Sequence, residues 1–290
     1  MQFAGSCPAR RSSASYARVP PAMKHITSRD NPFYKRLVRL SRASRAERRA
    51  EGTVVLEGVH LVRAYLDRFG SEGVELVVKE SAQAHPEIAR LATQAPTTSM
   101  ADGIFDIAAP VQSPVGVMAF APIPKPSGAR WKDGFQVFLD GVQDPGNLGS
   151  ILRSAAAAGA SVAHVSPQCA DPWSPKSLRG GMGAQFVLPI DEQADLGSAA
   201  QEAGLRLVAC TASGEASLFD ADLRGAIGFV IGSEGTGITP RLAAQAQQRV
   251  RIPMFNGVES LNAAAAAAVC FYEWLRQQGP AGWPVHPRDS

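Results

Sequence analysis

The sequence predicts an α/β protein built from two parts, and three observations support this prediction. Strand-like and helix-like segments alternate through residues 135–277, a pattern typical of a parallel sheet covered by helices on both faces. Residues 121–134 hold three prolines and two glycines, which is a linker composition. The length of 290 residues is enough for two domains of roughly 100–200 residues each.

Composition excludes several protein classes. With 45% hydrophobic and 19% charged residues, the chain is neither wholly disordered nor collagen-like. The longest run of low polarity, residues 261–275, contains Asn262 and Glu273 and is too short to span a bilayer, so we expect no membrane segment. The four cysteines are dispersed and form no CxxC pair, which favours a reducing, cytoplasmic location. The five histidines show no ligand spacing, so we expect no metal.

The chain divides by composition into five stretches. Residues 1–22 are rich in Ser, Ala and Arg, lack acidic residues and show no apolar periodicity. This composition is typical of a disordered extension, which we take as the expectation, and equally of an organellar transit peptide. We expect a small α/β domain over 23–120, a linker over 121–134, the larger α/β domain over 135–278 and a polar tail over 279–290. The elements expected in the first domain are basic helices within 33–49, a strand over 53–56, a helix over 59–69, a strand over 74–78 and β-like pieces in 104–120.

Charge is distributed unevenly between the two ends of the chain. Residues 1–70 carry 14 Lys and Arg against five Asp and Glu, whereas the remainder is acidic on balance. Such a basic segment is either a solvated surface or a site for a polyanion, and phosphate contacts by Lys and Arg dominate nucleic-acid affinity. The basic residues of the first helix are the candidates for RNA contact: Lys35, Arg36, Arg39 and Arg42.

Helix and strand signals alternate through the second domain, so their order can be read directly. The elements expected there are strands over 135–140, 161–166, 206–210, 226–231 and 249–252, helices over 148–158, 196–203 and 260–278, and a short apolar segment over 186–190. Ligands of such sheets bind beyond the carboxyl ends of the strands, so the loops there are the candidate site.

The first candidate loop begins at Asp140 and turns at Asp144-Pro145-Gly146. We expect Asn147 to cap the following helix and Arg153 to lie two turns into it. The spacing lacks the GxGxxG pattern of dinucleotide-binding proteins, which weakens an oxidoreductase interpretation.

Two further loops follow later strands. In the second, three glycines surround Glu234 directly after an apolar strand, and such glycines permit close backbone approach or positive φ. In the third, we expect Ser260 to cap an alanine-rich helix with Asn262 in its first turn. Asn is a poor residue for a helix interior, which favours a functional role for Asn262.

These three loops together resemble the motifs of the SpoU family of SPOUT RNA ribose 2′-O-methyltransferases. The motifs stand in order as LDGVQDPGNLGSILRSAAAAGA (139–160), FVIGSEGTGIT (229–239) and VRIPMFNGVESLNAAAAA (250–267). The similarity extends over ITSRDNPFYKRLVRL and VVLEGVHLVRAYLD near the N-terminus, which look like the family's substrate-binding domain.

The resemblance implies a trefoil-knotted methyltransferase domain preceded by an RNA-binding domain. It implies S-adenosyl-methionine as cofactor and a homodimer whose RNA site is shared between subunits. The expected partner is RNA, with ribosomal RNA favoured over transfer RNA because the N-terminal domain is separate. A non-catalytic RNA-binding or ribosome-assembly factor on the same fold is the alternative.

The resemblance also assigns roles to residues of this sequence. The polar motif positions fall on Asn147, Arg153, Glu234, Ser260 and Asn262, with Arg153 expected to hold the phosphate beside the ribose and to stabilise the developing alkoxide. The cofactor positions fall on Gly232, Ile252, Leu261, Thr211 and Met254, and Arg179 joins the RNA-binding candidates.

One position departs from the family pattern. The family often has Arg-Ala-Ser-x-Gly-Ala after a lysine, whereas this chain has Arg179-Gly180-Gly181-Met182-Gly183-Ala184. Gly181 therefore stands where a hydroxyl is frequent.

Overall fold

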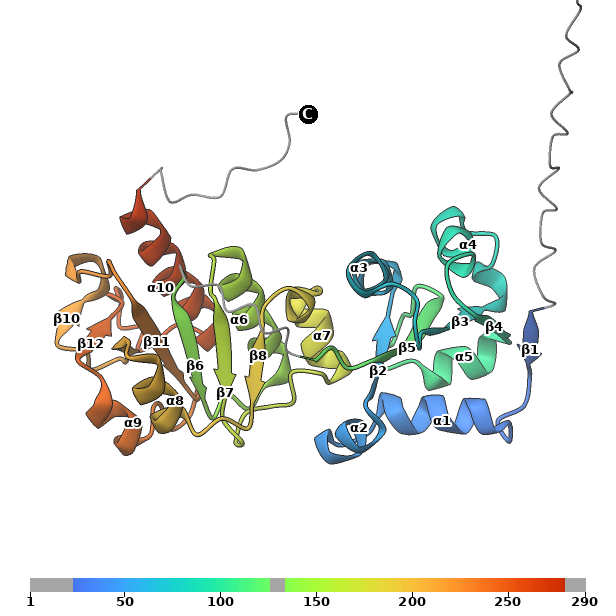
Figure 1. The fold of residues 1–290 in the computed structure, drawn as a ribbon, viewed down its shortest axis with the longest axis horizontal. Coiled ribbons are helices and arrows are strands. Elements are labelled where there is room, and N and C mark those ends of the chain that lie inside the picture. The colour runs from blue at the N-terminus through green and yellow to red at the C-terminus, as the bar shows by residue number, and fades with distance from the viewer. Residues whose placement is uncertain (1–22, 126–133, 280–290) are drawn as a thin grey trace, which may run out of the picture.

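The computed structural model describes residues 23–125 and 134–279 (Figure 1). The expected extension over 1–22, most of the expected linker and all but the first residue of the expected tail lie outside the described residues. The described chain contains two sheets, one before the linker and one after it.

The N-terminal sheet has five strands in the order β1-β4-β3-β5-β2. Strand β5 runs antiparallel to β2 and β3, and the other pairings are parallel. Helices α3 and α4 cover one face, and α1 and α5 cover the other (Figure 1). The elements are β1 Lys24–Ile26, α1 Pro32–Ser41, α2 Arg45–Glu51, β2 Thr53–Glu57, α3 Val59–Phe69, β3 Glu75–Lys79, α4 Pro86–Ala92, β4 Thr97–Met100, α5 Asp102–Ala108 and β5 Val117–Pro122.

Local capping explains where the two basic helices begin and end. The side chain of Asn31 accepts a hydrogen bond from the backbone N–H of Phe33, and Pro32 occupies the first helical position. Ser44 and Glu47 form a reciprocal capping box at the start of α2. Gly52 ends α2 at φ 62°, a left-handed conformation that glycine adopts without penalty.

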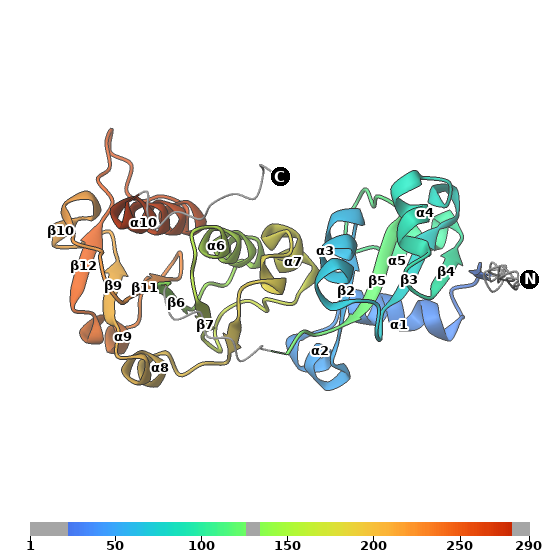
Figure 2. The same ribbon diagram turned by 45° about the horizontal axis from the view of Figure 1, so that its top comes forward.

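The C-terminal sheet has seven strands, all parallel, in the order β10-β12-β9-β11-β6-β7-β8. Helices α6, α7 and α10 lie on one face and α8 and α9 on the other (Figure 2), as expected for a parallel sheet. The elements are β6 Gln136–Asp140, α6 Pro145–Ala157, β7 Val162–Val165, α7 Pro175–Gly181, β8 Ile190–Glu192, α8 Leu196–Ala203, β9 Arg206–Cys210, β10 Ala216–Ser217, β11 Ile227–Gly232, α9 Pro240–Gln245, β12 Gln248–Arg251 and α10 Ala263–Gln278.

Several boundaries differ from the sequence expectations. Residues 104–108, which we expected in β-like structure, belong to helix α5, because Ile104, Phe105 and Ala108 share one buried helical face. Strand β5 extends through Ala121 and Pro122, which we expected in the linker, since β2 pairs with both residues. The trefoil knot that the resemblance implies stays a prediction.

Helix α2 joins the two halves of the molecule. Its Arg48 forms an ion pair of 2.6 Å with Asp171, and both side chains are buried, at 6% and 9% exposure. Arg49 pairs with Glu192, and a guanidinium nitrogen of Arg45 donates to the carbonyl of Cys169 at 2.9 Å. The C-terminal arginines of the basic segment therefore hold one sheet against the other.

Candidate active site

Three loops at the carboxyl edge of the C-terminal sheet meet through polar side chains. Asn147, near the start of α6, donates from Nδ2 to Oε1 of Glu234 in the loop after β11, at 2.6 Å. Asn262, just before α10, donates from Nδ2 to Oδ1 of Asn147 at 3.0 Å. The structure thus brings together three of the five polar residues that the motifs single out.

This three-residue cluster has a defined hydrogen-bond direction. The Glu234 carboxylate only accepts, so the amide of Asn147 must present its nitrogen to Glu234 and its oxygen to Asn262. Oδ1 of Asn262 in turn accepts from the backbone N–H groups of Ala264 and Ala265. The cluster therefore ties the first two loops to the N-terminus of α10.

Both expected helix caps, Asn147 for α6 and Ser260 for α10, are wrong. Asp144 is the N-cap of α6, since its Oδ1 accepts from the backbone N–H of Asn147 at 2.8 Å. The N-cap of α10 is Asn262 and not Ser260, which is exposed and precedes the helix by three residues. Asn147 is thereby free to use its side chain across the loops, whereas Asn262 serves both as cap and as link.

Asp144 also connects α6 to α7. Lys176 Nζ lies 2.6 Å from Oδ2 of Asp144. This hydrogen bond, followed by the one from the Asn147 backbone, lowers the pKa of the Asp144 carboxyl, which therefore stays ionised at neutral pH.

The loop that carries Glu234 is closed at both ends. A Cβ on Gly232 would lie 2.3 Å from the carbonyl carbon of Gly237, so only glycine fits where the loop returns on itself. Oδ2 of the buried Asp140 accepts from the backbone N–H of Thr239 at 2.7 Å. These contacts hold Glu234 in place although its side chain is exposed.

The cofactor candidates lie on the loops that follow β9, β11 and β12. Thr211 directly follows β9, and its Oγ1 is buried with no hydrogen-bond partner. Ile252 and Met254 are half-buried after β12, and Leu261 is 38% exposed. Apolar side chains beside an unpaired hydroxyl are the features of a site for an amphipathic small molecule.

Arg153 does not join the three-residue cluster within one chain. It is exposed on α6, and no hydrogen bond or ion pair joins it to another of the described residues. At 3.6 residues per turn, the six-residue separation places it about 120° around the helix from Asn147. Arg153 therefore points to a different side of α6.

The RNA-binding candidates differ in how strongly they are held. Lys35, Arg39 and Arg42 are exposed on or beside α1, although Lys35 pairs with Asp30. Arg36 is half-buried: it stacks 4.3 Å above the ring of Phe120, and its Nε donates to Glu51 at 2.8 Å. Arg39 also donates to Glu51.

Arg179 is exposed on the short helix α7. This places it beside the N-terminal half, because α7 packs against β2.

The unusual Gly181 has a structural explanation. A Cβ at this position would lie 2.2 Å from Oε1 of Gln185, whose side chain fills the space. The amide nitrogen of Gln185 donates to the carbonyls of Pro172 and Ser177, which keeps it there. A serine at 181 and the present position of Gln185 exclude each other.

Known proteins are similar to this chain in sequence and in fold. The family model described as the SpoU rRNA Methylase family matches residues 134–272. A Synechocystis protein named as an uncharacterized tRNA/rRNA methyltransferase, slr1673, is 32% identical over 269 residues, covering 89% of this chain and 96% of that protein. The chain belongs to the SpoU family.

Other SpoU relatives match along almost their whole length. The Bacillus subtilis protein named 23S rRNA (guanosine(2553)-2'-O)-methyltransferase RlmP is 28% identical, covering 86% of this chain and 98% of that protein. The crystal structure of the SpoU methyltransferase AviRb from Streptomyces viridochromogenes, in complex with AdoMet, superposes with a TM-score of 0.78 at 26% identity. That match covers 86% of this chain and 98% of AviRb.

Two features are absent from residues 23–125 and 134–279 of this SpoU protein. No helix there is long and apolar enough to cross a membrane. No group of three or more His, Cys, Asp and Glu side chains there is arranged to hold a metal ion.

Sequence reasoning missed Asp144 as a cap and Gln185 as the occupant of the space beside Gly181. An Asp before a proline at the first helical position is a recognisable cap signal. The pairing of Gly181 with Gln185 has no signal in a single sequence.

Proposed function

We propose that this protein transfers a methyl group from S-adenosyl-methionine to a ribose 2′-hydroxyl of RNA, with ribosomal RNA as the favoured substrate. The observation that carries the proposal is the hydrogen-bonded cluster of Asn147, Glu234 and Asn262 at the carboxyl edge of the sheet. It stands in a SpoU chain whose relative RlmP is named for 2′-O-methylation of 23S rRNA.

The residues present fit S-adenosyl-methionine. The unpaired buried hydroxyl of Thr211 would offer the cofactor a hydrogen bond, and Ile252, Met254 and Leu261 would offer it apolar contacts. Gly232 lets the loop after β11 return on itself at Gly237, and the backbone of this loop would border the cofactor. When bound, the cofactor supplies an electrophilic methyl group on a sulfonium, so the protein's own task is to position and activate the hydroxyl.

Within this scheme we assign the catalytic role to Arg153. A guanidinium carries N–H donors and no acceptor, so Arg153 acts as a hydrogen-bond donor. It holds the phosphate beside the target ribose and stabilises the charge that develops on the 2′-oxygen as the proton leaves. We assign positioning roles to Asn147, Glu234 and Asn262, whose hydrogen bonds hold the three loops together. Ser260 is exposed, two residues before Asn262.

We further propose that the protein works as a homodimer in which Arg153 of one subunit completes the partner's site. The absence of any contact between Arg153 and the cluster in one chain supports this arrangement. Exposed apolar side chains on the loop after β12 and on α10 support a covered surface there: Phe255 at 81% exposure, Val258, Leu261 and Tyr272. Light scattering should give twice the chain mass of 30.6 kDa, and a monomer would contradict the proposal.

Residues 23–120 are proposed as the RNA-binding domain, with the exposed Lys35, Arg39 and Arg42 contacting phosphates together with Arg179 and the half-buried Arg36. A cytoplasmic location is proposed as well, and the three free thiols at Cys169, Cys210 and Cys270 support it.

The experiment that tests the function offers labelled S-adenosyl-methionine to the protein with separate pools of unmodified large-subunit rRNA, small-subunit rRNA and bulk tRNA. We expect label in an rRNA pool. Label only in tRNA would show that the substrate is transfer RNA and not ribosomal RNA. Cofactor binding without label in any pool would favour the non-catalytic RNA-binding alternative.

A further inference from the structure

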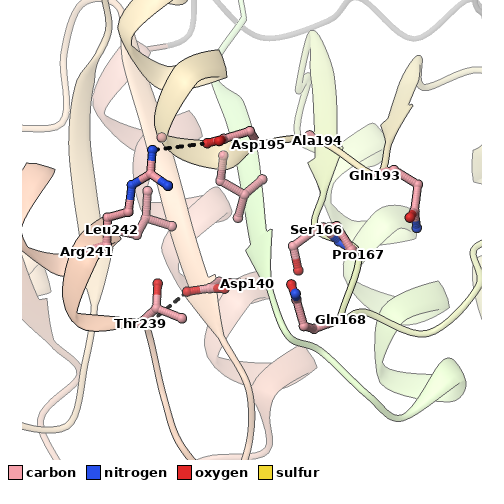
Figure 3. Close-up of a pocket in the computed structure, with 12 residues that line it drawn as sticks. Asp140, Ser166, Pro167, Gln168, Gln193, Ala194, Asp195, Thr239, Arg241 and Leu242 are labelled. Atoms are coloured by element: carbon pink, nitrogen blue, oxygen red, sulfur yellow. Dashed lines mark hydrogen bonds and ion pairs between the residues drawn. The ribbon is translucent and has the colours of Figure 1, made fainter.

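The C-terminal sheet carries a cleft that is separate from the residues assigned to cofactor and catalysis. It has a volume of about 310 Å³ and lies beyond the carboxyl ends of β6, β7 and β8, between these strands and helices α8 and α9 (Figure 3). None of Thr211, Gly232, Ile252, Met254 and Leu261 lines it. Its size falls at the lower end of the range for small-ligand sites.

Polar side chains with unused hydrogen-bonding capacity line this cleft. Gln168 and Gln193 are exposed at its wall, and no hydrogen bond of either side-chain amide is formed with another described residue. Asp140 uses Oδ2 for Thr239, and Asp195 uses Oδ1 for the Ser198 backbone N–H. The same Oδ1 of Asp195 also lies 3.6 Å from Nη2 of Arg241, which lines the cleft too (Figure 3). The second oxygen of each carboxylate accepts no bond from the described residues.

The walls of the cleft are held rigidly. Oγ of Ser166 accepts from the backbone N–H of Gly141, and Sγ of Cys169 donates to the carbonyl of Leu139. These contacts fix both ends of the segment that carries Gln168. Gln193 has φ 59°, a conformation that a non-glycine residue adopts at a cost and that marks a constrained position.

The N-terminal domain reaches the same walls. Arg45 donates to the carbonyls of Pro167 and Cys169, on either side of Gln168. Arg49 pairs with Glu192, the neighbour of Gln193. The cleft also adjoins the proposed active site, because the bond from Thr239 to Asp140 closes the loop that carries Glu234. Direct contacts therefore join α2, the walls of the cleft and the loop of the proposed active site.

The charge of the lining selects the part of a nucleotide that enters. The lining holds two carboxylates and one guanidinium, and the guanidinium of Arg241 is already paired with Asp195. The excess of negative charge disfavours a phosphate, so the phosphate stays outside and a base edge goes in. Hydrogen bonds from the Ser198 backbone lower the pKa of Asp195, which therefore stays an ionised acceptor at neutral pH. Guanine alone among the four bases presents two adjacent donors, N1–H and N2–H, on its Watson–Crick edge, and its O6 accepts from a glutamine amide.

We propose that this cleft binds a splayed-out guanine of the substrate RNA, read by Asp195 and Gln168 with Asp140 and Gln193 beside them. The inference rests on the proposed function in that the ligand is RNA. It adds a base-reading site at the junction of the two domains, where the bound nucleotide sets the register of the strand that enters the active site.

The test uses fluorescently labelled RNA heptamers of adenines whose central base is guanine, inosine or adenine. Binding is measured by fluorescence anisotropy with S-adenosyl-homocysteine present to fill the cofactor site. The variants are Gln168→Ala and Asp195→Asn, the second of which keeps an N-cap side chain on α8. Gln201→Ala, an exposed glutamine on α8 that does not line the cleft, is the matched control.

We expect the wild-type protein and Gln201→Ala to bind the guanine heptamer about tenfold more tightly than the adenine heptamer. Inosine, which lacks the 2-amino group, should lose most of that preference. Gln168→Ala and Asp195→Asn should bring the ratio close to one, and Gln168→Ala should leave the adenine heptamer's Kd unchanged. Equal binding of all three heptamers by the wild type, or a preference that survives in both variants, would overturn the inference.

Methyl transfer by the same preparations separates this inference from the proposed function. Suppose that the variants lose the guanine preference and that the wild type methylates no RNA. This outcome would support the guanine site and contradict the proposed methyltransferase activity. Methylation by the wild type, with no guanine preference, would do the reverse.

Discussion

Replacing Arg153 by alanine is expected to lower the turnover number for RNA methylation about 100- to 1,000-fold, the usual effect of removing one donor to a developing oxyanion. The fold should be unaffected, because Arg153 is exposed on α6 and alanine is a strong helix former. Single-turnover methylation and the melting temperature measure the two quantities on one preparation. Arg224→Ala, on an exposed arginine paired only with near neighbours, is the control and should keep full activity.

The same variant tests whether Arg153 acts across the subunit interface. If it does, a heterodimer of one Arg153→Ala subunit and one Glu234→Ala subunit contains one intact site and one site lacking both residues. Random mixing of two inactive proteins makes half of the dimers mixed, so about a quarter of wild-type activity should return. If Arg153 serves its own chain, every site lacks one residue and mixing restores nothing.

Breaking the ion pair between Arg48 and Asp171 is expected to have the largest effect on stability. Arg48→Ala leaves the carboxylate of Asp171 buried without its partner, which costs about 3–5 kcal/mol of unfolding free energy. The bond joins α2 to the C-terminal half, so the two halves should unfold in separate steps. Urea unfolding followed by circular dichroism measures both effects.

Two controls sharpen this measurement. Arg90→Ala removes an exposed arginine on α4 and should change the free energy of unfolding by less than about 0.5 kcal/mol. The double variant Arg48→Ala with Asp171→Ala removes both charges and should recover part of the loss. A stability of Arg48→Ala equal to that of the Arg90 variant would show that the junction does not depend on this pair.

The sequence predicts a helix or strand correctly where a local residue pattern determines where that element begins and ends. Helices α3 and α8 and strand β9 begin and end at the expected residues, because an apolar run or stripe between clear punctuating residues defines each one. Helices α7 and α9 were not predicted, because they have seven and six residues and too few turns to show a periodicity.

Contacts between distant parts of the chain lay beyond the sequence patterns. The run of basic residues over α1 and α2 predicts one basic surface. In the structure, however, Arg45 donates to a backbone carbonyl and Arg48 to a carboxylate, each more than 120 positions away in the sequence. The three motifs single out Asn147, Glu234 and Asn262, but the direct bonds from Asn147 to the other two form only when the strands align in the folded sheet. The cleft beside Asp140 likewise depends on three separate loops.

The central claim is that the methyl group goes to a ribose 2′-oxygen, and alkaline hydrolysis of the labelled RNA tests it most directly. Alkali cleaves RNA through the free 2′-hydroxyl, so a methylated ribose leaves an uncut dinucleotide. We predict that the label from the methylated pool is recovered in alkali-resistant dinucleotides. Label recovered in mononucleotides would place the methyl group on a base and contradict the account.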